Sequence, residues 1–403
     1  MRNVKRALVI GGSMSGLLAA LALVRRGWDV AVYERVAEPL AGRGAGIVAQ
    51  PELKAALRAL SLDADHDLGV EVPTRVMYAQ DGGVTHRIDW SQTMTSWDRV
   101  FHLLKAVLPQ ALYHHGRELR RIAQDAQGVT AHFAEGSVAE GDLLVGADGI
   151  RSTVRQQYLP ALAPLYAGYT AWRGLVAEAA FPPPLHAQLF DEFSFCLPPN
   201  EQMLGYPVAG PDNDLRAGHR RYNFVWYRPA SEERELPRLL TDESGRTHTL
   251  SIPPPLIARD VVARMRQEGE QVLAPPFNAM LSLCAQPFLQ PIYDLEVPRM
   301  AFGRVAILGD AAFVARPHVG AGVAKAAEDA LALADALAGH DDVETALRRF
   351  EEARLGVGEK IIARARRLGA YVQADLKSEA ERAYAAQHRA PDAVLAETAV
   401  MDF

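Results

Sequence analysis

Three glycine-containing turns carry the residues of this chain whose types and spacing point to chemistry. The first, Gly11-Gly12-Ser13-Met14-Ser15-Gly16, follows the apolar run Ala7–Ile10 and precedes a helical pattern. Gly11 would permit a tight turn, and Gly16 would let the helix pack close to the strand. The N-terminus of that helix offers free N–H groups and a partial positive charge to a pyrophosphate. Ser13 replaces the middle glycine of the usual dinucleotide fingerprint, so its hydroxyl could bond a phosphate oxygen while its Cβ narrows the approach.

Glu34 strengthens the interpretation of this turn. It ends the strand pattern Val30–Glu34, 18 residues after Gly16 (34 − 16), near the ~20 residues expected for an acid that binds a ribose. A carboxylate there accepts hydrogen bonds from both ribose hydroxyls and would repel a 2′-phosphate. An ordinary turn and a surface glutamate are the alternatives. The combination favours a bound ADP moiety.

Two further turns present an aspartate each. In Gly146-Ala147-Asp148-Gly149, a strand delivers Asp148 to a tight turn before a helix start rich in Arg and Ser. A helix capped by Ser152 is the structural alternative. The third turn, Gly309-Asp310-Ala311-Ala312, ends a buried strand pattern. An aspartate at the carboxyl end of an α/β strand lies where ligands bind.

The elements that must position these turns form three α/β blocks. The first is a βαβ pattern with its helix at Leu17–Arg26, closed by Gly27. The second covers about residues 97–149 and contains the strand patterns Val129–Phe133 and Leu143–Val145. The third runs from the strand 304–308 into a helix rich in small residues at 320–337.

Between these blocks, about residues 165–290, the pattern changes. Proline runs and the alternating segment Tyr222–Tyr227 indicate sheet and loops. We therefore predict an α/β fold: a discontinuous Rossmann-like nucleotide-binding domain (residues 1–70, 97–165 and 290–365) with an inserted, mostly antiparallel substrate domain (71–96 and 166–289). The charged amphipathic pattern Val343–Arg367 predicts a helix packed on the body, and residues 366–403 a C-terminal helical tail.

Composition narrows the function classes. The chain has 403 residues, 49% hydrophobic, with a formal net charge of −6 and no long single-sign block, which argues against nucleic acid as a partner. Its two cysteines, Cys196 and Cys284, lie outside any metal-like cluster, so we expect buried thiols in a reducing cytoplasm and no metal site. Neither a signal-peptide pattern nor an apolar run long enough to span a membrane is present.

In their order and spacing, the three turns resemble those of the class A flavoprotein aromatic hydroxylases, which have the para-hydroxybenzoate hydroxylase fold. The resemblance covers about residues 5–365. Residues 46–53 (GIVAQPEL), 166–174 (YAGYTAWRG), 316–318 and 324–326 are most similar to members that act on hydroxylated pyridines.

The resemblance implies non-covalently bound FAD and assigns roles to residues. The residues expected at its ADP half are Gly11, Ser13, Gly16, Glu34 and Arg35, with Arg43 near the pyrophosphate or ribityl chain. Asp148 would act indirectly on FAD and NAD(P)H, and Asp310 would bond a ribityl hydroxyl. The residues expected to line the isoalloxazine are Pro317, Gly320, Ala321 and Gly322. Two departures are Phe313, where many relatives have histidine, and Trp97, which takes the place of an FAD-contacting arginine and leaves Arg99 as the nearest substitute.

The resemblance also implies the reaction. NADH or NADPH would reduce FAD, dioxygen would add at flavin C4a, and the hydroperoxide would transfer oxygen to an electron-rich ring. The candidate substrate contacts are Tyr206, Trp226, Tyr227 and Tyr293, with Gln50 near the flavin edge and His318 as a candidate base. Each of them is otherwise a plausible core residue.

The expected substrate is a hydroxylated pyridine, and 2,6-dihydroxypyridine oxygenated at C3 is the best single candidate. A benzoate would need an arginine clamp, and the aromatic run 222–227 offers stacking and neutral hydrogen bonds instead, although Arg173 and Arg228 could still reach the pocket. A hydroxynicotinate, a hydroxybenzoate, or a reductase or redox regulator that hydroxylates nothing remain alternatives. A halogenase is disfavoured because its Trp-x-Trp-x-x-Ile motif is missing. We expect NADH as the donor, and leave open whether the chain forms a homodimer.

Overall fold

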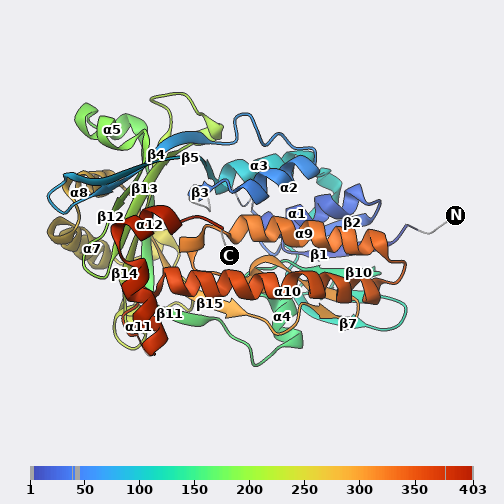
Figure 1. The fold of residues 1–403 in the computed structure, drawn as a ribbon. Coiled ribbons are helices and arrows are strands. Elements are labelled where there is room, and N and C mark those ends of the chain that lie inside the picture. Colours follow the sequence, from blue (N-terminus) through green and yellow to red (C-terminus); the bar gives the residue numbers. More distant parts are fainter. Residues whose placement is uncertain (1–3, 39, 41–45, 377, 402–403) are drawn as a thin grey trace.

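The computed structural model describes residues 4–38, 40, 46–376 and 378–401. Two large β-sheets dominate the described chain, one at each end of the molecule (Figure 1). Helices near the C-terminus run between them. The α/β class with C-terminal helices is confirmed.

The six-stranded sheet carries the three glycine turns. Its order is β16-β17-β10-β1-β2-β6, and all neighbours are parallel except β16 and β17. The strands are β1 (Arg6–Ile10), β2 (Asp29–Tyr33), β6 (Tyr113–His114), β10 (Leu143–Gly146), β16 (Ala301–Phe302) and β17 (Val305–Ile307). Their continuous apolar runs suit a parallel sheet, whose two faces are both covered.

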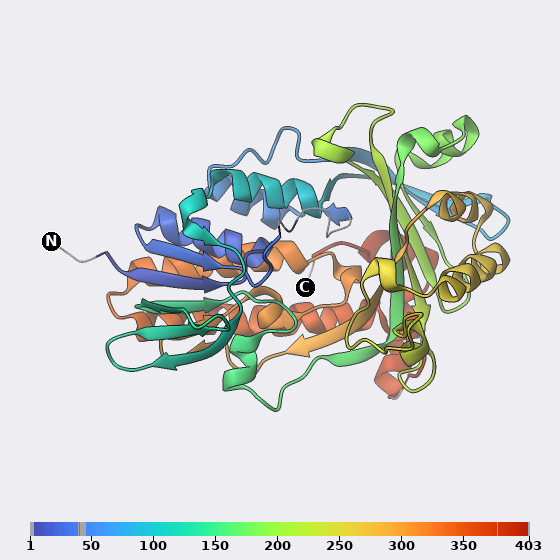
Figure 2. The same ribbon diagram turned by 180° about the vertical axis from the view of Figure 1, so that it is seen from behind.

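Helices cover one face of this sheet, and a small sheet covers the other. On the first side α1 (Met14–Arg25) packs against α9 (Gly322–Gly339), with α10 (Val343–Leu368) alongside α9 (Figure 1). A three-stranded antiparallel sheet lies on the other side (Figure 2) and consists of β7 (Leu119–Gln124), β8 (Val129–Phe133) and β9 (Val138–Gly141). Apolar side chains of these layers form one core.

The nine-stranded sheet has the order β18-β15-β11-β14-β13-β12-β4-β5-β3, and only β12 and β4 pair in parallel. Its strands are β3 (Gly46–Val48), β4 (Val70–Tyr78), β5 (Val84–Ser96), β11 (Leu165–Ala177), β12 (Glu192–Cys196), β13 (Gln202–Val208), β14 (Arg221–Pro229), β15 (Phe288–Glu296) and β18 (Phe313–Val314). The predicted mostly antiparallel sheet is therefore present.

The remaining helices have between 5 and 14 residues. They are α2 (Pro51–Ala59), α3 (Trp97–Val107), α4 (Thr153–Tyr158), α5 (Pro183–Leu189), α6 (Glu235–Leu239), α7 (Arg259–Val272), α8 (Pro275–Leu283), α11 (Glu379–His388) and α12 (Pro391–Glu397). Single 3₁₀ turns span Gln110–Leu112, Glu178–Ala180, Pro211–Asn213, Pro254–Leu256, Gly309–Ala311, Pro317–Val319 and Ala370–Val372.

The two faces of the nine-stranded sheet have separate cores. Helices α5, α7 and α8 cover the outer face, where Trp172 and Trp226 are buried. The inner face is turned toward the C-terminal helices and carries Tyr169, Tyr206 and Tyr227. Because successive side chains of a strand point to opposite faces, this division decides which aromatic residues can reach a site between the sheets.

The predicted elements agree closely with the observed ones. β8 has its predicted bounds, α1 begins at Met14 instead of Leu17, and α10 ends at Leu368 instead of Arg367. β15 crosses the expected domain boundary at residue 290 because it pairs with β11. The division into domains stays a prediction. Cys196 and Cys284 are both buried and free, as expected. Within the described ranges, none of the helices is both long and apolar enough to cross a membrane.

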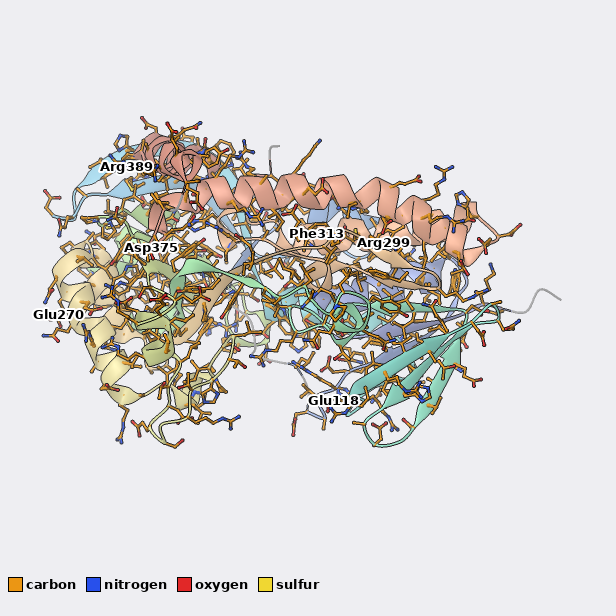
Figure 3. The ribbon with its side chains drawn as sticks, turned by 90° about the horizontal axis from the view of Figure 1, so that it is seen from below. Glu118, Glu270, Arg299, Phe313, Asp375 and Arg389 are labelled. Carbon is orange, nitrogen blue, oxygen red and sulfur yellow. The ribbon has the colours of Figure 1, made fainter. Side chains whose placement is uncertain are left out.

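Phe313 illustrates how tightly the C-terminal helices pack. It follows the third glycine turn and lies beneath α10 (Figure 3). A Cβ added to Gly358 of α10 would lie 2.4 Å from the Phe313 ring, whereas one added to Gly356 would meet no atom within 4 Å. The two glycines therefore form a matched pair on one helix.

We expect Gly358→Ala to lower the free energy of unfolding by roughly 1–3 kcal/mol, because the new methyl group overpacks the contact with Phe313. Gly356→Ala should raise it by about 0.5–1 kcal/mol, because alanine favours the helix. Urea unfolding of both variants measures this difference. Equal effects of the two substitutions would contradict the packing of Phe313 against α10.

Candidate functional site

The first glycine turn packs closely against the end of β10 and against α1. Gly11 has φ +105°, and a Cβ on it would lie 2.3 Å from the carbonyl oxygen of Ala147 at the end of β10. A Cβ on Gly16 would lie 1.8 Å from the carbonyl oxygen of Gly11. Side chains at either position would push the layers apart. The predicted roles of both glycines in the turn and in helix packing therefore match the geometry.

Ser13 occupies the N-cap of α1, but its side chain makes no capping hydrogen bond. The first-turn N–H groups of a helix have no intrahelical partner, and they carry the positive end of its dipole. The Ser13 hydroxyl and these amides face a cavity that also borders Gly11 and Asp148. Such a helix end suits a phosphate group.

Glu34 is held in place directly after β2. It is buried, its Oε2 accepts a hydrogen bond from the backbone N–H of Gly12, and its Oε1 accepts one from Val36, both at 2.9 Å. A carboxylate has about four acceptor sites, so two stay available after these bonds. Glu34 and the exposed Arg35 both line the cavity. The fixed carboxylate can therefore accept hydrogen bonds from a ligand.

Asp148 and Ser152 act together at the start of α4. The Asp148 carboxylate accepts hydrogen bonds from Ser152 Oγ at 2.5 Å and from the backbone N–H groups of Thr153 and Val154 at 2.7 and 3.2 Å. Ser152 in turn accepts a bond from Arg155 N. Burial raises the pKa of Asp148, and these hydrogen bonds oppose the shift. The helix capped by Ser152 is thus present, and the Asp148 carboxylate binds the N–H groups of the same helix end.

Asp310 has a different environment. It lies in the 3₁₀ turn after β17 and is exposed, but the surface that it exposes belongs to the wall of the same cavity. Its carboxylate has no hydrogen-bond partner within the described residues. It can therefore accept a hydrogen bond from a ligand hydroxyl.

A buried ionic group fixes the turn that carries Asp310. Asp329 of α9 accepts a hydrogen bond from the N–H of Gly309 at 3.1 Å and one from Arg354 of α10 at 2.8 Å. Lys325 is also buried, with its Nζ 3.6 Å from Asp329. Buried charges are stable only when they are paired in this way. The pairing joins α9 and α10 to the end of β17.

The start of α9 forms the next wall. A 3₁₀ turn at Pro317–Val319 leads to Gly320, which has φ +63° and so favours glycine. Gly322 lines the cavity, whereas Pro317, Gly320 and Ala321 are not among its lining residues. Arg43 lies outside the described residues.

His318 is buried among aromatic rings. Its ring centroid lies 4.2 Å from that of Tyr227 and 5.8 Å from that of Tyr169. Burial lowers the His318 pKa to about 3, and the charge of Arg316 adds to the effect. The imidazole is therefore neutral at physiological pH. Its Nε2 has no hydrogen-bond partner among the described residues.

Strand alternation divides the predicted substrate set between the two faces of the nine-stranded sheet. Tyr206 and Tyr227 lie on the inner face. Trp226 points to the outer face, where its Nε1 donates to Glu201 at 2.7 Å. Tyr293 also faces away from the inner face, since its neighbour Ile292 belongs to the inner core.

Two polar residues on the inner face complete this region. Arg173 Nη1 donates to Gln290 at 2.8 Å, while its Nε has no partner within the described residues. Asn223 Oδ1 accepts from Gly46 N at 2.9 Å and leaves its Nδ2 without a partner in the same set. From the sequence, Arg173 was expected only to be within reach of the pocket, and Asn223 was not predicted as a site residue. Asn223 lies four residues before Tyr227 in the same strand, so the two side chains point to the same face. This alternation is the signal that could have predicted Asn223.

Gln50 and Trp97 have different surroundings, and only Trp97 is among the lining residues of this cavity. Gln50 precedes α2, is buried, and donates from Nε2 to the carbonyl oxygen of Ala399 at 2.8 Å. Trp97 lines the cavity that Glu34 and Asp310 share. Arg99 does not line that cavity; burial lowers its pKa, and the charges of Asp67 and Asp63 oppose the shift.

The cavity fits the cofactor that the sequence predicts. Its volume of about 640 Å³ lies in the usual range for a bound cofactor. It combines a helix N-terminus, two carboxylates open to hydroxyl groups, and a rim of arginines. The lining residues among the predicted cofactor contacts are Gly11, Ser13, Glu34, Arg35, Asp148, Asp310 and Gly322. These donors and acceptors suit the phosphates and sugar hydroxyls of a dinucleotide.

Comparison with known proteins identifies the family. An FAD binding domain model matches residues 5–163 and 292–365, and an FAD binding domain-like model matches residues 166–294. The chain is 34% identical over 373 residues to 2,6-dihydroxypyridine 3-monooxygenase of Paenarthrobacter nicotinovorans, covering 91% of each chain. It is 29% identical to 3-amino-4-hydroxybenzoate 2-monooxygenase of Streptomyces cremeus, covering 90% of this chain and 86% of that one.

A solved structure is similar over nearly the same length. The structure of 2,6-dihydroxypyridine-3-hydroxylase from Arthrobacter nicotinovorans superimposes with a TM-score of 0.86 at 32% identity, covering 92% of this chain and 93% of that one. Together with the cavity and its three glycine turns, these matches show that the chain belongs to the FAD-binding family of aromatic monooxygenases and uses FAD as its cofactor.

Proposed function

We propose that this protein hydroxylates 2,6-dihydroxypyridine at C3, giving 2,3,6-trihydroxypyridine. The overall reaction consumes NADH, a proton, dioxygen and the substrate, and releases NAD⁺, water and the hydroxylated ring. The observation that carries the proposal is the inner face of the nine-stranded sheet. There Arg173, Asn223, Tyr206 and Tyr227 form a polar, aromatic wall, in which Arg173 Nε and Asn223 Nδ2 are buried without a hydrogen-bond partner among the described residues. The relative that is 34% identical is named 2,6-dihydroxypyridine 3-monooxygenase, after the same substrate.

The cofactor-binding residues have separate roles in this proposal. Ser13 and the first-turn amides of α1 bind the pyrophosphate, Glu34 binds the adenosine ribose, and Asp310 bonds a ribityl hydroxyl. Pro317 and the turn Gly320–Gly322 line the ring system, where backbone N–H groups can stabilise negative charge. When bound, FAD supplies the redox chemistry that passes electrons from NADH to dioxygen.

Arg173 recognises the ionised substrate. Gln290 fixes its Nη1, and the free Nε–H can donate to a negatively charged ring oxygen. A charge-assisted hydrogen bond of this kind favours the ionised, more nucleophilic form of the ring. Arg228, which the sequence analysis also considered, is paired with Glu201 on the outer face and with Glu268. Arg173 is therefore the cation that we assign to the substrate.

His318 does not need to act as a base. Its low pKa makes it a poor proton acceptor, and an ionisable dihydroxypyridine requires little help. The aromatic contacts of its ring with Tyr227 suit a residue that fixes the wall. We therefore assign His318 a packing role beside the ring site.

Substitution of the two carboxylates tests the placement of FAD. Glu34→Ala and Asp310→Ala should each weaken FAD binding roughly tenfold to a hundredfold, because each loses a charge-assisted hydrogen bond worth about 1.5–3 kcal/mol. Fluorescence titration of the flavin-free protein measures the change. Glu140→Ala, at an exposed position of β9, serves as the control. Unchanged affinity in both cavity variants would contradict the placement.

The low pKa of His318 predicts a pH effect on stability. Between pH 6.5 and about 3 the unfolded chain binds a proton that the folded chain excludes. Stability that is present above pH 6.5 is therefore lost as the pH falls, at about 1.4 kcal/mol per pH unit. His318→Phe should remove about 2 kcal/mol of the destabilisation between pH 7 and pH 5. Urea unfolding at both pH values checks this, and equal pH dependence of variant and parent would contradict it.

The substrate assignment has a direct test. Incubation with NADH, dioxygen and 2,6-dihydroxypyridine should give a product heavier by one oxygen, with one NADH consumed per product. NADH should give a kcat/KM at least equal to that of NADPH. If a hydroxynicotinate or hydroxybenzoate gains oxygen while 2,6-dihydroxypyridine does not, the substrate is wrong and only the reaction class stands. If no ring gains oxygen, a reductase or redox regulator is favoured.

Substitutions of Arg173 and Trp226 test in the same assay which face of the nine-stranded sheet binds the substrate. Arg173→Met should lower kcat/KM roughly tenfold to a hundredfold, since it removes a charge-assisted hydrogen bond to the substrate. Trp226→Phe should lower stability through the lost bond to Glu201 but leave KM unchanged. A raised KM in the Trp226 variant alone would reverse our assignment of the faces.

A further inference from the structure

The segment after α12 touches the candidate active site through its backbone. The N–H of Ala399 donates to the carbonyl oxygen of His318 at 2.7 Å. The carbonyl oxygen of Ala399 accepts from Gln50 Nε2 at 2.8 Å and from Gln92 Nε2 at 3.4 Å. One residue near the end of the chain thus links the turn before α2 to the turn before α9. Both turns were predicted to border the flavin ring.

Gly320 shows how close this contact is. A Cβ at Gly320 would lie 3.0 Å from both Ala399 Cα and Gln50 Nε2. Ala399 is buried and has φ +56°, a left-handed conformation that is uncommon for residues other than glycine. Such a conformation persists only when the surrounding contacts enforce it. The three residues therefore pack as one unit.

An arginine anchors the approach to this segment. Arg75 of β4 is fully buried, and its Nη1 donates to the carbonyl oxygen of Leu395 in α12. Its Nε and Nη2 donate to Gln92 Oε1 at 3.1 and 2.5 Å. Burial lowers the pKa of Arg75 to about 9. Burying this charge is costly, so its use to hold Gln92 and α12 argues for a defined docked position.

The docked segment also closes the inner-face core. Val394 and Leu395 of α12 join the cluster that contains Tyr206 and Tyr227. Figure 1 shows α12 in red beside the nine-stranded sheet, next to the end of α10. The match to the FAD binding domain model ends at residue 365, so α12 and Ala399 lie beyond the matched residues.

We propose that residues Thr398–Val400 are a positioning element of the active site. Their backbone holds the Gln50 and His318–Gly320 turns at a fixed separation and keeps water out from that side. The inference rests on the proposed function, in which these turns border the flavin ring. A hydroxylase needs such closure, because water entering the site diverts the reaction. With the segment undocked, NADH, a proton and dioxygen would give NAD⁺ and hydrogen peroxide, and the substrate would form no new bond.

Two substitutions at Ala399 form a matched pair. Ala399→Pro removes the N–H that bonds to His318 and cannot adopt φ +56°, because the proline ring fixes φ near −65°. Ala399→Gly keeps the N–H and adopts the positive φ without strain. Proline should therefore release the segment, and glycine should keep it docked.

The first readout needs no cofactor. Hydrogen exchange of the flavin-free protein should show faster exchange of the peptides that contain Gln50 and His318–Gly320 in Ala399→Pro, but not in Ala399→Gly. A chain that ends at Glu397 should show the same loss of protection, and it replaces the proline variant if that variant does not fold. Unchanged protection of both turns in the shortened chain would overturn the proposal.

The second readout is the coupling of the FAD-loaded enzyme. Ala399→Pro should raise the NADH consumed per hydroxylated product severalfold, with hydrogen peroxide accounting for the difference, and Ala399→Gly should restore the parent ratio. Loss of protection without any change in coupling would overturn the role in closure. If the parent protein itself hydroxylates no substrate, the proposed function fails, and the exchange of the two turns still decides whether the segment positions them.

Discussion

The close approach of α1 to β1 and β10 is the constraint on which the rest of the site depends. Only glycine fits at Gly11 and Gly16, because a Cβ at either would lie within 2.3 Å of a backbone carbonyl oxygen. This contact sets the N-terminus of α1 at the carboxyl ends of the parallel strands, where α/β folds bind their ligands. It also brings the turn of Asp148 beside that helix end, while the bond from Gly12 to Glu34 draws in the end of β2. These contacts together bring polar groups from the ends of three strands to one place.

Buried charge holds the opposite side of the cavity. The third turn depends on Asp329, which binds the turn's N–H and is balanced by Arg354 and Lys325. A buried ion pair adds little net stability, and removing one partner is costly because it leaves the other charge unpaired. The main effect of this ion pair is on geometry, because it fixes the position of Asp310 relative to α9 and α10. The apolar contact of Phe313 with Gly358 sets the same spacing by packing.

Much of this arrangement could be predicted from local sequence signals. The spacing of Gly11, Gly16 and Glu34 predicted the βαβ unit, because all three residues of the fingerprint lie within one short segment of the chain. The position of Asp310 at the carboxyl end of a strand could be predicted because an apolar strand pattern ends there in a glycine turn. The sequence could not show which of Trp226 and Tyr227 lies on the inner face. Alternation shows that neighbouring side chains point to opposite faces, but not which face is turned toward the cofactor. The contact of Gln50 with Ala399 joins residues 349 positions apart, and no local pattern encodes it.

A crystal structure with bound FAD tests the central claim most directly, namely that the cavity around the three glycine turns holds the cofactor in one defined orientation. We expect the adenosine ribose hydroxyls to lie within hydrogen-bonding distance, about 2.6–3.2 Å, of the Glu34 carboxylate. We also expect the pyrophosphate at the N-terminus of α1 and a ribityl hydroxyl on Asp310. FAD bound with its adenosine away from Glu34, or in the neighbouring cleft that Arg151, Arg246 and His248 line, would contradict this placement of the cofactor.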